Sequence, residues 1–101
     1  MSLELRLKII WHEKFLGLAV FQSTLKDSIP LTTYYLWPKT AAWEQLKLDL
    51  DSKFWLSGQE KIKVLNATAE VMNYWKKNHK PNEVNDFLNS FGDLIMWDLV
   101  T

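Results

Sequence analysis

Hydrophobic and polar side chains alternate along the first part of the chain. Leu3, Leu5, Leu7, Ile9 and Trp11 are apolar, and Glu4, Arg6 and Lys8 stand between them. A period of two indicates a strand with one buried face. Residues 15–22 are apolar nearly throughout, which indicates a second strand covered on both faces, with Gly17 at a close approach. Residues 31–37 are rich in Thr and Tyr and predict a third strand, which Pro38 stops, whereas 23–29 is polar and loop-like.

The period then changes to that of a helix. Residues 40–50 place Ala42, Trp43, Leu46 and Leu50 on one stripe. Ser57 and Glu60 form an S-x-x-E capping box that opens a second helix, which we expect to reach Lys77. Its predicted core side holds Ile62, Leu65, Ala69 and Met72, flanked by Val64, Val71 and Trp75, with Lys63, Asn66, Glu70, Asn73 and Lys77 on the solvated side.

The end of the chain has a different character. Beyond the boundary at Pro81, residues 84–91 carry apolar side chains at helical spacing, and Gly92 is a suitable stop. The apolar run 94–97 must dock on something. The predicted fold is therefore α+β: a three-stranded antiparallel sheet from residues 3–37, two helices from 40–77 on one face, and a C-terminal helical tail. Residues 1–80 form the predicted domain, and 81–101 an acidic, aromatic extension.

Composition narrows the function classes. The 101 residues suit one domain, and the absence of cysteine excludes disulfides, thiolate zinc sites and a cysteine nucleophile. The apolar runs are too short to cross a membrane, and we expect no signal or transit segment, because the strand pattern begins directly after Met1-Ser2. All 12 basic residues lie at or before Lys80 and exceed the acids there by four, while 81–101 has four acids and no base. Eleven of the 12 are lysines, which suit phosphate contact better than base reading.

The sequence contains little that suits catalysis. The two histidines, at 12 and 79, are isolated, and the three glycines form no phosphate-binding loop. Asp49 and Asp51 point about 200° apart on a helix and form no carboxylate pair. We therefore expect no enzyme, cofactor, metal or small-molecule substrate. A small-molecule binding module stays open as an alternative, because a sequence does not show a pocket.

The tryptophans fall into two groups. Trp11, Trp43 and Trp75 lie on the apolar sides of their elements and are predicted core residues. Trp37 and Trp55 lie at junctions between elements, beside Lys39 and Lys53. An aromatic ring next to a cation is typical of partner anchors and of base-stacking platforms, so these two residues are candidates for contact as well as for packing.

The ordered motifs resemble a known family. They run from Lys8-Ile9-Ile10-Trp11 through Pro30-Leu31-Thr32, Trp37-Pro38 and Ala42-Trp43-Glu44-Gln45-Leu46 to a Ser52-Lys53-x-Trp55 link and a closing Tyr74-Trp75. About three quarters of the chain, residues 5–77, is similar to the plastid-specific ribosomal protein of type three, a small-subunit ribosomal protein of plastids and cyanobacteria. Two segments depart from the family pattern: 21–30 lacks a Gly-Lys-Gly character, and 81–101 resembles an addition.

The resemblance implies a structural component of the small ribosomal subunit that stabilises ribosomal RNA and touches neighbouring proteins. Expected rRNA contacts are Lys8, Lys14, Trp37, Lys39, Lys53, Trp55, Lys61, Lys76 and Lys77, and expected protein contacts are Phe87, Phe91 and Trp97. The implied location is the plastid stroma with a plastid gene, or the cytoplasm of a cyanobacterium. The alternative from the residues alone is a non-ribosomal protein–protein adaptor that uses exposed aromatics and the acidic tail.

Overall fold

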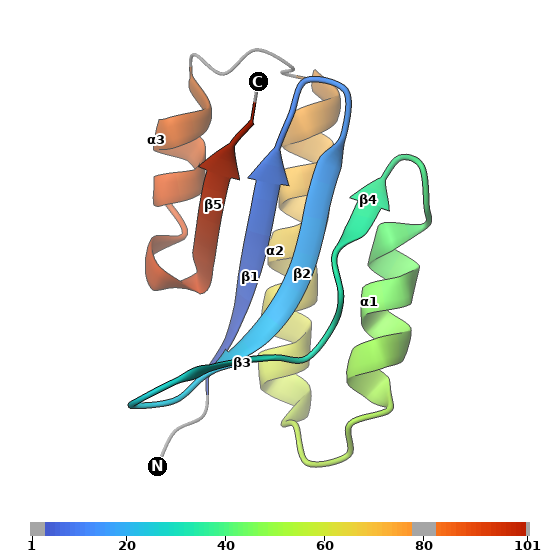
Figure 1. Cartoon of the computed structure of the whole chain (residues 1–101), viewed down its shortest axis with the longest axis vertical. Helices are drawn as coiled ribbons and strands as arrows, with labels where there is room; N and C mark the ends of the chain where they lie inside the picture. The colour runs from blue at the N-terminus through green and yellow to red at the C-terminus, as the bar shows by residue number, and fades with distance from the viewer. Residues whose placement is uncertain (1–3, 78–82, 101) are drawn as a thin grey trace.

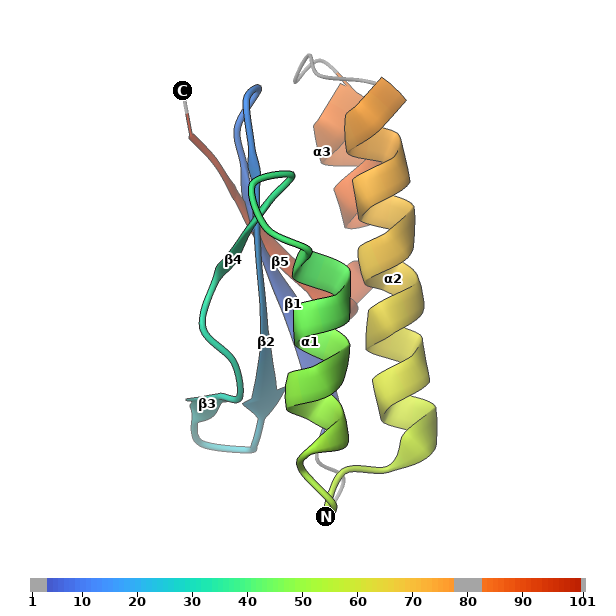
Figure 2. The ribbon, with the colours of Figure 1, turned by 90° about the vertical axis from the view of Figure 1, so that its right-hand side faces the viewer.

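The computed structural model describes residues 4–77 and 83–100. It confirms the α+β class: helices cover one face of a single sheet and leave the other face open (Figures 1 and 2). In chain order the elements are β1 (Glu4–Trp11), β2 (Leu16–Ser23), β3 (Ser28–Pro30), β4 (Tyr35–Trp37), α1 (Ala42–Asp51), α2 (Gly58–Lys77), α3 (Val84–Asn89), a 3₁₀ turn (Gly92–Leu94) and β5 (Ile95–Leu99).

The alternating segment at the start of the chain is β1, as predicted. It pairs antiparallel with β2, from Trp11 opposite Leu16 to Glu4 opposite Ser23. Its apolar positions face the helices and are buried, while Lys8 is exposed on the open face. The close approach predicted at Gly17 is confirmed, because a Cβ there would lie 3.1 Å from Cβ of Ile10.

The third predicted strand is two short strands. β3 lies mostly in the segment predicted as a loop, and β4 is the end of 31–37. Both pair antiparallel with β2, β3 along residues 21–23 and β4 along residues 16–18. Between them, the N–H groups of Leu31 and Thr32 both donate to the carbonyl of Val20, and the hydroxyl of Thr32 accepts from the N–H of Val20. This shared acceptor interrupts the ladder, as a bulge does. The continuous strand 31–37 was therefore a wrong prediction.

The last segment of the described chain is a strand and not part of a helical tail. Helix α3 confirms the helical pattern after Pro81, but β5 runs parallel to β1, with Ile95 opposite Leu7 and Leu99 opposite Trp11. The sheet therefore has five strands in place of the predicted three, in the order β3-β2-β1-β5 with β4 also paired to β2. A parallel neighbour needs a crossover connection, and the helices between β1 and β5 supply it.

Helix α2 begins where its sequence signal predicts. The hydroxyl of Ser57 accepts a hydrogen bond from the N–H of Glu60 at 3.1 Å, which confirms the cap. In a capping box the glutamate also reaches back to the N–H of the cap residue, but here Glu60 contacts the sheet. One carboxylate oxygen of Glu60 accepts from the N–H of Leu5 at 3.5 Å, at the end of β1 that extends beyond β5.

The predicted core side of α2 was rotated from the true one. Ile62 is 60% exposed, whereas Val64 is fully buried. The solvated side was predicted correctly, because Lys63, Asn66, Glu70, Asn73 and Lys77 are all exposed. The buried side chains of α2 are Val64, Leu65, Ala67, Thr68, Val71 and Trp75. The helix packs on β1, β2 and α1 together, so the buried arc is wider than one stripe and is centred on the sheet.

One hydrophobic core joins the sheet and the helices. Trp11 is fully buried in it, and Val84, Leu88 and Ile95 belong to the same cluster. The segment predicted as an extension, 81–101, therefore shares through its described residues the core of the predicted 1–80 domain. Trp43, predicted in the core, is half-buried and donates its indole N–H to the carbonyl of Leu65 at 3.0 Å, which ties α1 to α2.

Candidate nucleic-acid interface

Four of the seven lysines predicted to contact rRNA gather at one end of the molecule. Lys14 lies in the β1–β2 turn, Lys39 between β4 and α1, and Lys76 and Lys77 in the last turn of α2. The β1–β2 turn and the end of α2 lie at the top of Figure 1 and the β4–α1 connection at its upper right, and all three lie in the upper half of Figure 2. We call this set of four lysines the basic end. Lys14, Lys39 and Lys77 are exposed, as is Glu13, the acid next to Lys14.

Tryptophans hold the segments of the basic end together. The indole N–H of Trp75 donates to the carbonyl of His12 at 2.8 Å, which ties the end of α2 to the β1–β2 turn. Trp37 of β4 meets the ring of Trp75 edge-to-face at 5.3 Å between centroids. The ammonium of Lys76 lies 5.5 Å from the centroid of Trp37, a cation–π contact. These tryptophan contacts therefore join the segments that carry the lysines of the basic end.

The basic end also contains a shallow hollow. Lys14 and Lys39 line it together with Phe15, Leu36 and Pro38, and its volume is about 470 Å³. The hollow joins apolar surface to two cations, the combination that a nucleotide's base and phosphate require together. Trp37, which the sequence marked as a junction residue, is half-buried and lies between Leu36 and Pro38 in the chain.

Lys8 lies apart from the basic end, on the open face of the sheet. It lines a second hollow, of about 330 Å³, with residues of β2 and of the β3–β4 segment, among them Phe21 and Tyr34. Phe21 is itself buried, while Tyr34 is exposed. Lys8 is therefore a candidate RNA contact of its own, apart from the four lysines of the basic end.

The remaining predicted rRNA contacts lie at the opposite end, around the α1–α2 loop. Lys61 approaches Asp51 at 3.6 Å, and Lys47 approaches the same carboxylate at 2.7 Å. The hydrogen bond from Lys47, reinforced by Lys61, lowers the pKa of Asp51 below its ordinary value. The ammonium of Lys53 donates to the carbonyl of Asp49 at 3.4 Å. The cations of this end are therefore engaged within the protein.

Trp55 is exposed at the same end, together with a residue that the list of predicted contacts omits. Phe54 is 91% exposed and meets Trp55 edge-to-face at 5.6 Å between centroids. The signal for Phe54 was its place beside Trp55 in a short link between two helices. We define the Phe54–Trp55 pair as the aromatic turn.

The predicted protein contacts of the tail pack mainly against the protein's own core. Phe87 of α3 stacks on Tyr74 at 3.9 Å between ring centroids, and Phe91 meets Phe87 edge-to-face at 5.3 Å. Trp97 of β5 is half-buried and also packs on the core cluster. Each ring keeps an exposed part, but most of its surface serves to fix α3 and β5 on the sheet.

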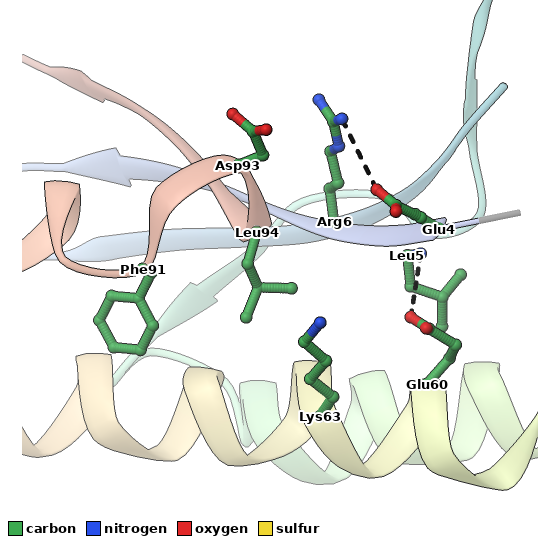
Figure 3. Close-up of a pocket in the computed structure, with 8 residues that line it drawn as sticks. All are labelled: Glu4, Leu5, Arg6, Glu60, Lys63, Phe91, Asp93 and Leu94. Carbon is green, nitrogen blue, oxygen red and sulfur yellow. Dashed lines mark hydrogen bonds and ion pairs between the residues drawn. The ribbon is translucent and has the colours of Figure 1, made fainter. Parts of the chain in front are cut away.

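A third hollow lies where β1 extends beyond β5 (Figure 3). Its volume is about 260 Å³, and its charged side chains are Glu4, Arg6, Glu60, Lys63 and Asp93. Figure 3 shows Arg6 and Asp93 on one side of β1, and Lys63 and Glu60 rising from α2 on the other. Arg6 approaches Glu4 at 3.8 Å, and Glu60 accepts from β1. Three acids and two bases line this hollow, so its charge is mixed and favours neither an anion nor a cation strongly.

The described part of the chain holds neither a metal-binding cluster nor a helix suited to cross a membrane. Within residues 4–77 and 83–100, no group of three or more His, Asp or Glu side chains is placed to hold a metal ion. None of the helices built from those residues has the length and hydropathy that crossing a bilayer requires.

Comparison with known proteins identifies the family. A profile of the plastid and cyanobacterial ribosomal protein family (PSRP-3 / Ycf65) matches residues 31–78. The chain is 39% identical over 90 residues to a probable small ribosomal subunit protein cS23 of Synechococcus sp. (strain JA-3-3Ab), covering 89% of this chain and 91% of the relative.

Two further relatives carry the same protein name and have similar identities to this chain. The small ribosomal subunit protein cS23 of Mesostigma viride is 39% identical over 92 residues, covering 91% of this chain and 75% of its own length. That of Gracilaria tenuistipitata var. liui is 40% identical over 73 residues, covering 72% and 74%. The chain therefore belongs to the plastid and cyanobacterial ribosomal protein family, PSRP-3/Ycf65, and is a structural protein and not an enzyme.

Proposed function

We propose that this protein is a structural component of the small ribosomal subunit of a plastid or cyanobacterium, and that its basic end contacts ribosomal RNA there. The relatives are named small ribosomal subunit proteins. The observation that carries the RNA contact is the convergence of Lys14, Lys39, Lys76 and Lys77 from three segments that tryptophan contacts join at one end.

The mechanism is electrostatic and does not depend on base sequence. Lysine ammonium groups bind phosphate oxygens as point charges, so the shape of the folded RNA selects the site. The hollow between Lys14 and Lys39 offers apolar surface beside the cations, where an unstacked base fits next to its own phosphate. Lys8 adds a second contact if RNA extends over the open sheet face.

Location follows from the same proposal. The protein works in the plastid stroma, or in the cytoplasm if its source is a cyanobacterium, and a plastid gene suits its preference for lysine over arginine. Sequencing DNA from purified plastids of the source organism tests the plastid gene. A nuclear copy with a transit segment would contradict that part.

The RNA contact is tested by the salt dependence of binding. The probe is the small ribosomal subunit of a cyanobacterium whose gene for this family is deleted, and binding is measured by co-sedimentation from 50 to 300 mM KCl. Each phosphate that a protein neutralises adds about 0.7–0.9 to the log–log slope. The triple variant Lys14→Gln, Lys39→Gln and Lys77→Gln should bind less tightly, with a slope smaller by about two.

A matched triple variant controls for net charge. Lys26→Gln, Lys47→Gln and Lys63→Gln removes the same charge from segments away from the basic end and should leave the slope nearly unchanged. Equal slopes for the two triple variants would contradict the RNA contact at the basic end. Salt-independent binding that survives nuclease treatment would favour the adaptor function.

A further inference from the structure

The aromatic turn is the most exposed apolar feature of the α1–α2 loop. Phe54 is 91% exposed and Trp55 56% exposed. The loop lies at the bottom of Figures 1 and 2, at the opposite end from the basic end. Aromatic rings dominate the energetics of cores and interfaces when they are buried, so two neighbouring rings in solvent need an explanation.

Turn formation does not explain these residues. The N–H of Leu56 donates to the carbonyl of Lys53 at 3.1 Å, so Phe54 and Trp55 are the two central residues of a four-residue turn. Gly, Pro, Asn, Asp and Ser are the residues that such positions favour. The turn gains no burial from Phe54, and the identity of this residue has no local structural cause.

The turn is held in place by its surroundings. The N–H of Ser52 donates to the carbonyl of Leu48 and its hydroxyl to the carbonyl of Asp49, at 3.1 and 2.7 Å. On the other side, Leu56 packs against the core, and Ser57 caps α2. Since the loop is already ordered, binding through the aromatic turn loses little conformational entropy, which is a property of strong anchors.

The ring geometry favours a protein partner over RNA. The planes of Phe54 and Trp55 lie at 84° to each other. Successive bases of a strand stack in parallel and require ring faces that are roughly parallel to each other. Two perpendicular rings instead present an edge and a face together, which is the shape that fills a pocket lined by aliphatic and aromatic side chains.

The charges around the aromatic turn also favour a protein partner over RNA. Lys47 and Lys61 share the carboxylate of Asp51, and the ammonium of Lys53 bonds to a main-chain carbonyl. Phosphate binding would have to break these contacts. The cations around the two rings are therefore already engaged within the protein, and the exposed rings form the apolar part of this surface, as in the core of a protein interface.

We infer that the aromatic turn inserts into an apolar pocket of a neighbouring protein of the small ribosomal subunit, while the basic end contacts RNA. Leu48 and Ile62, both exposed within about one helical turn of the loop, add apolar surface near this end of the two helices. This inference rests on the proposed function, since it takes the ribosomal subunit as the setting. It also assigns Trp55 to protein and not to RNA.

Photocross-linking tests the class of partner. The full-length chain with Phe54→p-benzoyl-phenylalanine is bound to the same deletion-strain subunits, irradiated, and digested with ribonuclease. The expected product is an adduct with one ribosomal protein that ribonuclease leaves intact. An adduct that ribonuclease removes, an adduct of twice the chain's own mass, or no adduct from a chain that co-sediments would each overturn the inference.

Affinity measurements separate this contact from the basic end. Phe54→Ser with Trp55→Ser should weaken binding about 10-fold and leave the salt slope unchanged, because an apolar contact releases no counterions. Leu25→Ser is the matched control, since Leu25 is also 91% exposed but lies in the β2–β3 turn, and it should change affinity less than about twofold. Equal losses for the two variants would overturn the inference.

The wild-type chain separates the two proposals. If it fails to co-sediment with the subunits, the proposed function fails and the inference falls with it. If it binds with the predicted salt slope but the aromatic turn contributes neither an adduct nor affinity, only the inference fails.

Discussion

Trp75 shows how a single residue links the fold to the site. Its ring is buried between the sheet and α2, its N–H donates to the turn after β1, and its ring meets Trp37 edge-to-face. The helical stripe in the sequence predicts that Trp75 faces the core. The partners of its ring and its N–H are not predictable, because they come from segments 38 and 63 residues away.

Ser57 gives a prediction for the start of α2. Ser57→Ala removes the acceptor for the N–H of Glu60 and should lower the free energy of unfolding by about 1 kcal/mol. Ser57→Asp keeps an acceptor and should stay near wild type. Urea unfolding followed by circular dichroism measures both, and equal midpoints for wild type and Ser57→Ala would show that α2 begins elsewhere.

Tyr35 gives a pH-dependent prediction. Its hydroxyl donates to the carboxylate of Asp49, joining β4 to α1, and this bond raises the pKa of Tyr35 above its ordinary value. A raised pKa means that the folded state holds the proton more tightly. The stabilisation is therefore complete below about pH 10 and is lost as the pH rises through the folded pKa.

The variant that isolates this bond is Tyr35→Phe. It should cost about 1 kcal/mol at pH 8, and the gap to wild type should narrow above about pH 10. Tyr34→Phe, one residue away, is the control and should unfold like wild type. Urea denaturation across this pH range measures the gap, and a gap that stays constant would contradict the role of the Tyr35 proton.

At the scale of elements, local sequence patterns predicted whether each long element is a helix or a strand. They did not predict every element that it pairs with or packs against. The capping box marked the start of α2, and alternation marked β1. The apolar run 94–97 was predicted to need a docking site, yet periodicity does not say that the site is the free edge of β1. The rotated face of α2 has the same cause, since α1 and the sheet together set which side is buried.

Docking of β5 on β1 is testable by two neighbouring substitutions. Ile95 is buried on the core side of β5, while Met96 on the opposite face is 46% exposed. Ile95→Ala should therefore cost about 2–3 kcal/mol, and Met96→Ala less than about 1 kcal/mol. Similar small costs for both variants in urea unfolding would show that β5 does not dock.

The whole molecule is an elongated body, 38 × 26 × 20 Å, with chemically different ends. The lysines of the basic end are spread from residue 14 to residue 77, so only folding brings them together. Sequence supplied the types of residue and the family resemblance, which the relatives confirm. It did not separate Lys53, Lys61 and Trp55 from the basic end, because their neighbours in space are set by the α1–α2 loop.

The most direct test of this account is a cryo-electron microscopy reconstruction of the small ribosomal subunit from the organism that encodes the chain. The account predicts density for this fold, with the ammonium groups of Lys14, Lys39 and Lys77 within about 4 Å of phosphate oxygens and the aromatic turn in a pocket of a neighbouring protein. A subunit that lacks this fold, or one in which the basic end faces solvent and RNA covers the aromatic turn, would contradict it.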